Sequence, residues 1–221
     1  MEERDQKGHP SQVEPEKIIR SYQRVSDHGE VFTPAWIVDE MLDLVIDEAS
    51  RIESRFLEPA CGSGNFLTKI LNRKLNDVNR RYETDSFLKK QYSAVALMSI
   101  YGIELLEDNA IECRNRLLNL ICEFLNIKTE SKFAKAAQTV LEINIIQGDA
   151  LTMLDDNDDP ILFAEWSYLG SAKFVRRDFA FSTMSQLSSW ESDSLFASVG
   201  DENIFTPINE YPKFTFEDLA K

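Results

Sequence analysis

The sequence predicts an α/β protein with a mainly parallel sheet, helices on both faces of the sheet and a short β-rich C-terminal extension. Three stretches support this class. Residues 56–66, FLEPACGSGNF, run from an apolar pair through an acid and a glycine turn into a helical pattern. Residues 99–105 and 143–151 are apolar strands with an acid near the end, and helical stretches separate all three strands. Such an alternation of strands and helices is typical of a parallel sheet covered by helices.

Composition sets the size of the domain and limits its partners. The chain has 221 residues, enough for one domain with extensions, and 43% of them are apolar, which is enough to bury a core. The formal net charge is −14. We do not expect such a chain to wrap nucleic acid by itself, because phosphate neutralisation needs clustered Lys and Arg. An acidic balance by itself indicates only solubility.

The cysteines and histidines predict no metal site. Cys61, Cys113 and Cys122 form no CxxC pair, and His9 and His28 lie in the polar N-terminal arm. An odd number of cysteines fits a reducing cytosol better than a disulfide framework, so we expect a cytoplasmic protein. The charged start of the chain is unlike a secretory signal, and no apolar run reaches membrane-spanning length, so no membrane association is expected.

The N-terminal arm, residues 1–28, is polar and charged, and one short helix is expected in it at 16–23. After the arm, Thr33 is a good N-cap and Pro34 suits the first helical position. Apolar residues then recur at helical spacing, which predicts an amphipathic helix over 34–50.

The glycine turn follows the first predicted strand. Gly62 and Gly64 permit backbone angles that side chains forbid, so a ligand can approach the main chain there. Asn65 comes directly after the turn and suits the cap of the next helix. Glu58 ends the strand at the carboxyl edge, where open α/β sheets bind ligands. Its carboxylate disfavours a phosphate and suits a hydroxyl or an ammonium group.

Apolar periodicity predicts further helices over 86–99, 107–125 and 130–142. Cys113 and Cys122 fall on the apolar side of the second of these helices. We therefore expect both thiols in the core and not at a reactive site.

The second predicted strand, 99–105, carries Glu104 near its carboxyl end. In doubly wound sheets an acid at this place commonly binds ribose hydroxyls. The spacing from Glu58 is longer than the roughly 20 residues of the dinucleotide fingerprint. The additional predicted helix, 86–99, accounts for the extra length.

Four segments resemble the motifs of one enzyme family, in the family's order. Residues 58–66 resemble motif I, D/E-P-A-C-G-S-G-N-F, and residues 29–34 resemble motif X, G-x-x-F-T-P. Residues 101–104 resemble motif II and residues 148–151 resemble motif III. The family is the S-adenosylmethionine (SAM)-dependent DNA methyltransferases that modify adenine N6. The chain is most similar to the modification subunits of type I restriction systems and to fused restriction-methylation enzymes.

This resemblance implies a Rossmann-like methyltransferase fold, SAM as cofactor, and a set of cofactor-binding residues. The motif X residues would touch the methionine part of SAM, Glu104 would bind the ribose, and Leu105 would lie against the adenine. Asp149 would accept a hydrogen bond from the adenine amino group, and Ala150 would donate its backbone N–H. The full set is Phe32, Thr33, Pro34, Glu58, Pro59, Ala60, Cys61, Gly62, Gly64, Asn65, Phe66, Glu104, Leu105, Asp149, Ala150 and Leu151.

The family's catalytic motif, Asn/Asp-Pro-Pro-Tyr/Phe, has no clear counterpart in the sequence. In the family, two oxygens of this turn hold the adenine amino hydrogens, and the aromatic residue stacks on the flipped base. The segment at the corresponding place is 161–168, ILFAEWSY. Glu165 would replace the Asn and Tyr168 would be the stacking residue, whereas Trp166 and Ser167 stand where the two prolines should be.

Two functions therefore stay open. The chain is either a DNA adenine-N6 methyltransferase, or the modification-subunit part of one in a restriction or phage-defence system. Alternatively, it is a SAM-binding module with degraded chemistry that serves as a partner or regulatory subunit. In both cases the charge of −14 favours DNA contact either through a partner subunit, as in a hetero-oligomer, or through a missing recognition domain.

The expected domains are the arm 1–28, a methyltransferase-like domain 29–168 and an extension 169–221. Lys173, Arg176 and Arg177 form the one local basic cluster, in a stretch whose alternation predicts a hairpin. The cluster is either a half-buried strand with solvated arginines or a nucleic-acid or partner contact. Further edge strands are expected at 204–205 and 214–216, and a last helix from residue 216.

Overall fold

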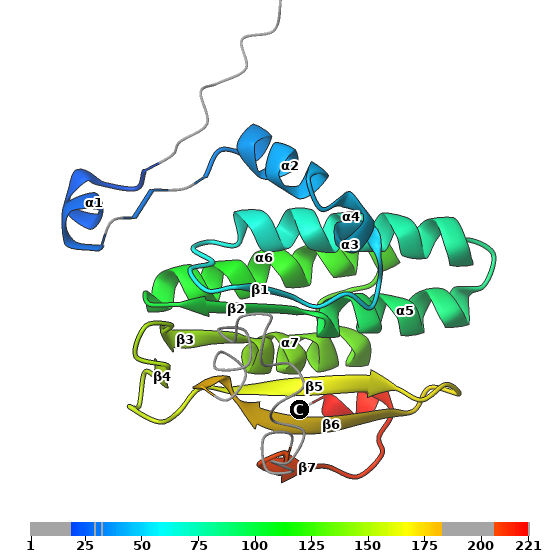
Figure 1. Ribbon diagram of the computed structural model, residues 1–221. Coiled ribbons are helices and arrows are strands. Elements are labelled where there is room, and N and C mark those ends of the chain that lie inside the picture. The colour runs from blue at the N-terminus through cyan, green and yellow to red at the C-terminus, as the bar shows by residue number, and fades with distance from the viewer. Residues whose placement is uncertain (1–18, 29, 32, 183–205, 221) are drawn as a thin grey trace, which may run out of the picture.

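The computed structural model describes residues 19–28, 30–31, 33–182 and 206–220 (Figure 1). Phe32, part of the expected cofactor site, and the expected edge strand at 204–205 lie outside the described residues. No helix in the described ranges is long and apolar enough to cross a membrane.

The main sheet has four strands in the order β1-β2-β3-β4. β1 (Phe56–Glu58), β2 (Ile100–Glu104) and β3 (Ile145–Asp149) are parallel, and the short β4 (Leu154–Asp155) is antiparallel to β3. Because the three parallel strands run in one direction, their carboxyl ends meet at one edge of the sheet. The predicted α/β class with a mainly parallel sheet is confirmed.

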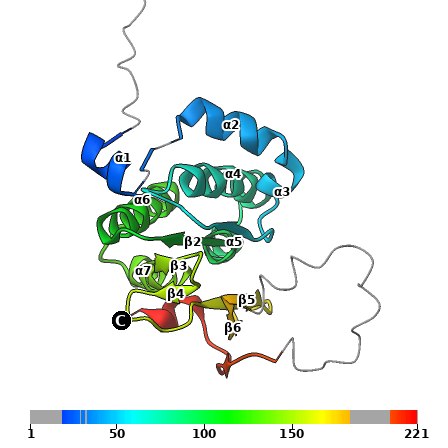
Figure 2. The ribbon, with the colours of Figure 1, turned by 60° about the vertical axis from the view of Figure 1, so that its left-hand side comes forward.

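Two pairs of helices connect the parallel strands. α4 (Asn65–Tyr82) and α5 (Ser86–Met98) lie between β1 and β2, whereas α6 (Glu107–Leu125) and α7 (Lys132–Asn144) lie between β2 and β3. α4 packs on α6, α5 packs on α7, and all four helices contact β2. Figures 1 and 2 show α4 and α6 above β2, and α7 level with β3.

The N-terminal helices differ from the prediction. α1 (Tyr22–His28) begins later than the expected helix, and the helix predicted over 34–50 is split into α2 (Ala35–Asp43) and α3 (Ile46–Ser50). The break falls in the run Leu44-Val45-Ile46, where β-branched residues lower helix propensity. It redirects the chain so that Ala49 and Ile52 are fully buried.

The predicted C-terminal hairpin is confirmed as a second, antiparallel sheet. β5 (Leu162–Tyr168) pairs with β6 (Phe174–Ala180), and β6 pairs with β7 (Asn209–Glu210). The domain boundary expected after residue 168 falls inside this hairpin. Instead of the edge strand expected at 214–216, Phe214 makes one isolated bridge to β6, and the last helix is a 3-10 turn, η2 (Phe216–Leu219).

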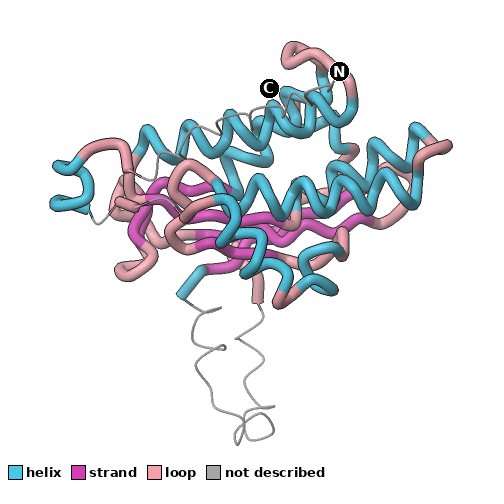
Figure 3. The backbone as a smooth tube through the Cα atoms, turned by 90° about the horizontal axis from the view of Figure 1, so that it is seen from above, coloured by secondary structure: helices cyan, strands magenta, loops and turns pink. Residues whose placement is uncertain are grey.

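The hairpin is attached to the α/β part by buried polar contacts. The Tyr101 hydroxyl on β2 donates to the Ala164 carbonyl over 2.8 Å, and the Trp166 indole N–H donates to the Asn144 side chain on α7 over 2.9 Å. In the view from above, helices lie on both sides of the strands (Figure 3). The hairpin thus packs beside α5 and α7 and does not extend the main sheet.

Candidate cofactor site

The glycine turn joins β1 to α4 at the carboxyl edge of the sheet. The Cys61 N–H donates to the Ile103 carbonyl over 3.0 Å, which fixes the start of the turn against β2. Gly62 and Gly64 then take positive φ angles of 52° and 86°. Gly64, and not the expected Asn65, is the N-cap of α4, because a left-handed backbone at this position favours glycine. Asn65 is the first helical residue.

Glu104 lies where the ends of β1 and β2 meet. Its carboxylate accepts hydrogen bonds from the Gly62 N–H over 2.7 Å, from the Leu106 N–H over 3.1 Å and from the Asn109 side chain over 3.3 Å. A carboxylate offers about four lone-pair sites, so Glu104 can accept a further hydrogen bond from a ligand hydroxyl.

Asn109 was not anticipated from the sequence. Its side-chain nitrogen donates to Glu30 over 2.6 Å and to Glu104 over 3.3 Å, and this fixes the orientation of the amide. The buried Asn109 Oδ1 has no hydrogen-bond partner within the described part of the chain. An unsatisfied buried acceptor is uncommon, and a ligand that donates a hydrogen bond here would satisfy it. These acceptors fit the ribose of the cofactor that the sequence resemblance implies.

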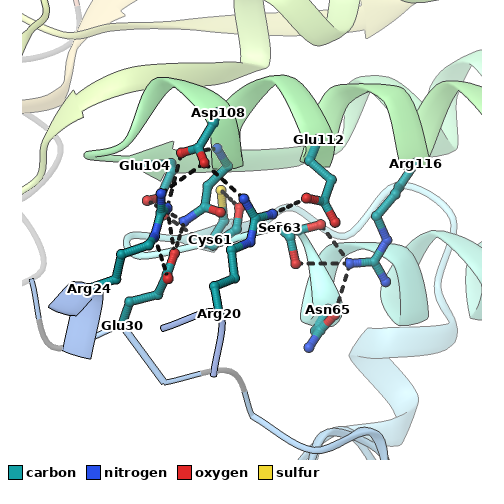
Figure 4. A network of polar contacts seen from close by, with 12 residues as sticks. Arg20, Arg24, Glu30, Cys61, Ser63, Asn65, Glu104, Asp108, Glu112 and Arg116 are labelled. Carbon is teal, nitrogen blue, oxygen red and sulfur yellow. Dashed lines mark hydrogen bonds and ion pairs between the residues drawn. The ribbon is translucent and has the colours of Figure 1, made fainter. Parts of the chain in front are cut away.

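An ion-pair network ties the segment around α1 to this region (Figure 4). The Arg24 guanidinium donates hydrogen bonds to Glu30 over 2.6 and 2.7 Å and to Asp108 on α6 over 2.9 Å. These contacts, with Arg24 the largest influence on both acids, hold the pKa of Glu30 and of Asp108 below their ordinary values. Arg20 adds contacts to Asp108 and Glu112. The network therefore favours the ionised carboxylates of Glu30 and Asp108. Glu30 lies close to Glu104, since the Asn109 side chain bonds to both.

A second part of the site lies at the end of β3. Leu105 and Asp149 line one cavity of about 310 Å³, together with Gly148 and Thr152. Asp149 also accepts a hydrogen bond from the Leu151 N–H over 2.8 Å. The structure thus brings together two of the three residues expected to contact the adenine. Leu151 itself is 91% exposed.

The remaining predicted residues of motif I differ in accessibility. Pro59 and Ala60 are exposed at the turn, and Glu58 is partly buried. Burial raises the pKa of Glu58, against the opposing effect of a backbone hydrogen bond from Ala60. The thiol of Cys61 is buried, and contact with Cys113 and burial raise its pKa. The Cys61 side chain therefore packs in the core, and the Cys61 N–H and carbonyl are paired with the Ile103 carbonyl and the Gly64 N–H.

Four further predicted residues surround the turn or pack near it. The Thr33 carbonyl accepts from the Asn65 side chain over 3.1 Å, which links the segment before α2 to the turn. Pro34 is the N-cap of α2, whereas Thr33 was the expected cap, and its carbonyl accepts the first N–H bonds of the helix. Phe66 and Ala150 pack against the core.

Glu165 and Tyr168 lie on the hairpin, away from this set of residues. Glu165 is opposite Arg177 in the β5–β6 ladder and forms ion pairs with Arg177 and with Arg55, the latter over 2.8 Å. Burial acts to raise the pKa of Glu165, but the two guanidinium groups outweigh it and hold that pKa below its ordinary value. Both carboxylate oxygens are therefore already engaged by cations.

Tyr168 is a packed aromatic residue. Its ring contacts Tyr92 edge-on at 5.6 Å and Phe174 at 4.9 Å between ring centres. It lines a cavity of about 270 Å³ with Arg55, Tyr101 and other residues, and none of the expected cofactor-binding residues lines that cavity.

A comparison with protein families assigns the chain. Residues 38–157, more than half of the chain, match the family described as MmeI, DNA-methyltransferase domain. The chain belongs to this family. The MmeI-type match covers β1 to β4 and α4 to α7, and so includes the glycine turn, Glu104 and Asp149. It ends before β5, so it does not include Glu165 or Tyr168. No curated protein and no solved structure matches the chain.

The described ranges contain no group of three or more metal-ligating side chains suited to a metal ion. The sequence did contain a signal for one of the missed residues. Asn109 is a polar residue directly beside Ala110 on the apolar side of the predicted helix 107–125, and a polar side chain at such a place needs a buried partner.

Proposed function

We propose that this chain binds SAM at the carboxyl edge of β1, β2 and β3 and belongs to a system that methylates adenine N6 in DNA. The observation that carries the proposal is the position of Glu104, whose carboxylate joins the glycine turn to the end of β2 beside the unsatisfied Asn109 Oδ1. Acceptors at this edge suit ribose hydroxyls, as in other doubly wound sheets.

The chain's own residues have distinct tasks in this proposal. Glu104 and Asn109 would accept hydrogen bonds from the ribose, and Asp149 would accept one from the adenine amino group. Leu105 would pack on the adenine ring, and Glu58 would attract the ammonium of the methionine part. SAM, when bound, supplies the electrophilic methyl group.

A second candidate function is a SAM-binding partner subunit without transfer activity of its own. The observation in its favour is that Glu165 is engaged by Arg55 and Arg177 within a continuous strand. An oxygen that holds an adenine amino hydrogen must be free and well aligned, and a displacement near 1 Å can cost about 100-fold in rate.

DNA contact is proposed to come from a partner, in a hetero-oligomer of the cytoplasm. The two arginines of the basic cluster lie on β6 and are engaged within the chain, because Arg176 pairs with Asp178 over 2.7 Å and Arg177 pairs with Glu165. Together with the net charge of −14, this leaves little basic surface for phosphates.

Calorimetric titration with S-adenosylhomocysteine (SAH) and with SAM tests the proposal. We expect one-site binding by the parent chain, loss of binding in Asp149→Ala, and binding weakened by about ten-fold in Glu104→Gln, since one good hydrogen bond to a charged group is worth roughly that much. Glu83→Gln, which removes an exposed acid just after α4, is the matched control. If the parent binds neither compound, or if both site variants bind like the parent, the assignment is wrong.

A further inference from the structure

α6 supports the glycine turn at two points of one face. Cys113 and Arg116 are three residues apart on this helix, so their side chains lie side by side. A Cβ added at Gly64 would come within 2.6 Å of the Cys113 sulfur, which means that the turn rests directly on Cys113. Arg116 reaches the same turn from the next position on that face.

One nitrogen of Arg116 holds both sides of Gly64. The Nη1 group donates to the Ser63 carbonyl over 2.7 Å, to the Ser63 hydroxyl over 3.1 Å and to the Asn65 side-chain oxygen over 2.9 Å (Figure 4). Ser63 is only 6% exposed. Its carbonyl therefore depends on a protein donor, because water has little access to it.

Asn65 connects Arg116 to the segment before α2. Its oxygen accepts from Arg116 while its nitrogen donates to the Thr33 carbonyl over 3.1 Å. These two bonds fix the amide orientation. Arg116 is thus connected to both segments that the proposed cofactor site needs, the glycine turn and the residues at Thr33.

We infer that Arg116 is a positioning residue for the cofactor, a role that acts through Ser63 and Asn65 and rests on the proposed function. Arg116 sets the backbone of the turn and the placement of Thr33 relative to it. Binding energy depends on such pre-arranged geometry, since sites that are loose by about 1 Å lose much of their effect.

Arg114 provides a matched control on the same helix. Its guanidinium also donates to a main-chain carbonyl, that of Ile145 over 2.9 Å. Ile145 is the first residue of β3, at the end of the strand opposite to Asp149. Arg114→Met therefore removes a comparable arginine–carbonyl contact on the far side of the sheet from the proposed cofactor edge.

The experiment measures SAH affinity by calorimetry, thermal midpoints, and hydrogen exchange of the peptide covering 58–66, for the parent and four variants. The variants are Arg116→Met, Arg116→Lys, Asn65→Ala and Arg114→Met. We expect Arg116→Met to weaken SAH binding by about 10- to 100-fold and to speed exchange in 58–66. A lysine ammonium has three N–H donors and can replace the single guanidinium nitrogen that makes these contacts, so Arg116→Lys should keep the affinity within about three-fold of the parent. Arg114→Met should lower the thermal midpoint by about as much as Arg116→Met does, because each change removes one arginine–carbonyl contact, and it should keep the parent's affinity.

The outcomes separate this inference from the proposed function. If the parent binds no SAH, both fail, because no site remains for Arg116 to arrange. If the parent binds SAH and Arg116→Met binds it within about two-fold of the parent, the inference alone is overturned. Equal losses of affinity in Arg116→Met and Arg114→Met would also overturn it, since they indicate general destabilisation. Should Arg116→Met fail to fold, Asn65→Ala decides through both readouts. A loss of affinity together with faster exchange of 58–66 in the ligand-free chain supports the role, because loss of a direct cofactor contact alone would leave that exchange unchanged. Parent-like binding or parent-like exchange overturns it.

Discussion

Gly64 is required by two separate constraints at one residue. Its φ of 86° is in the region that side chains rarely adopt, and a Cβ there would meet the Cys113 sulfur. Gly170 in the β5–β6 turn has a similar φ of 81° but nothing within 4 Å of an added Cβ. The pair therefore separates the cost of backbone conformation from the cost of steric overlap.

We expect Gly170→Ala to lower the free energy of unfolding by about 1 kcal/mol, the cost of a left-handed alanine. Gly64→Ala should lower it by roughly 2–4 kcal/mol, because the overlap with Cys113 adds to that cost. Urea denaturation measures both changes. The Cys113→Ala change should relieve part of the Gly64→Ala loss in the double variant. Equal losses in the two single glycine variants would show that Cys113 exerts no steric constraint.

Among the elements, α4 contains a buried lysine whose structural role the sequence pattern does not reveal. Lys74 lies within this helix and is completely buried. Its ammonium donates to the carbonyls of Arg51 over 2.9 Å, Ile52 over 3.0 Å and Ser54. These residues connect α3 to β1. A lysine in an amphipathic helix is usually interpreted as solvated, and only the tertiary structure reveals that this one closes the loop before the first strand.

Lys74→Met should lower the free energy of unfolding by about 3 kcal/mol, because three buried carbonyls lose their donor. Lys69→Met is the control on the same helix, since Lys69 pairs with Asp39 and both side chains are more than one-third exposed. That change should cost less than about 1 kcal/mol. Denaturant titration of both variants tests the difference. Equal losses in the two variants would show that the carbonyl contacts of Lys74 stabilise the fold no more than the exposed pair of Lys69 with Asp39.

The attachment of the segment around α1 should depend on pH through Glu30. Arg24, and then Asn109, hold the pKa of Glu30 below its ordinary value. The unfolded chain therefore binds this proton more readily than the folded chain. The resulting stabilisation is complete above the ordinary pKa of about 4.3 and is lost as the pH falls through the lowered pKa of the folded state.

At pH 6 we expect Glu30→Gln to lower the free energy of unfolding by about 0.5–1 kcal/mol, a modest value because the ion pair is partly solvated. This difference from the parent should shrink towards zero as the pH falls through the lowered pKa of Glu30, because the parent's Glu30 then becomes protonated as well. Glu83→Gln is the control. A difference between parent and Glu30→Gln that stays constant throughout the acid titration would contradict the coupling.

At the scale of the whole molecule, local patterns predicted the elements of the α/β half well. They predicted a hairpin, but not how it packs against the α/β half. The helix expected over 107–125 has the bounds of α6, because its apolar periodicity and its burial agree. The three parallel strands were likewise visible as apolar runs with an acid near the end. The placement of Glu104, Leu105 and Asp149 at one edge then follows from strand direction, since parallel strands end together. Their expected roles toward the cofactor came from the family resemblance.

What the sequence could not supply depends on contacts between distant segments. The roles of Asn109 and Arg116 follow from α6 packing against the turn and the segment before α2, which helical periodicity does not encode. The surroundings of Glu165 are set by Arg55, which is 110 positions earlier, and by the register with Arg177. A register is a tertiary property, and a shift by one residue would turn Glu165 to the other face of the strand.

Glu165 therefore decides between the two candidate functions. If it carries the chemistry, Glu165→Ala should abolish methyl transfer to duplex DNA and keep SAM affinity nearly unchanged. If it is a structural ion-pair residue, the purified parent should show no transfer above background although it binds SAM, and Glu165→Ala should only destabilise the hairpin by leaving Arg55 and Arg177 without their carboxylate. We expect the second result, because both carboxylate oxygens are engaged and no proline pair shapes a turn in the continuous strand β5.

Tritiated-methyl incorporation into duplex DNA, with SAM binding measured in parallel, distinguishes these outcomes. Arg176→Met, which breaks the neighbouring pair with Asp178 on the same hairpin, controls for loss of hairpin structure. Robust incorporation by the purified parent would refute our expectation. Its loss in Glu165→Ala but not in Arg176→Met would then assign the chemistry to this segment, since only a direct role makes one ion pair of the hairpin indispensable and its neighbour dispensable. Absence of transfer with intact SAM binding would instead leave the adenine-holding oxygens to another component of the system.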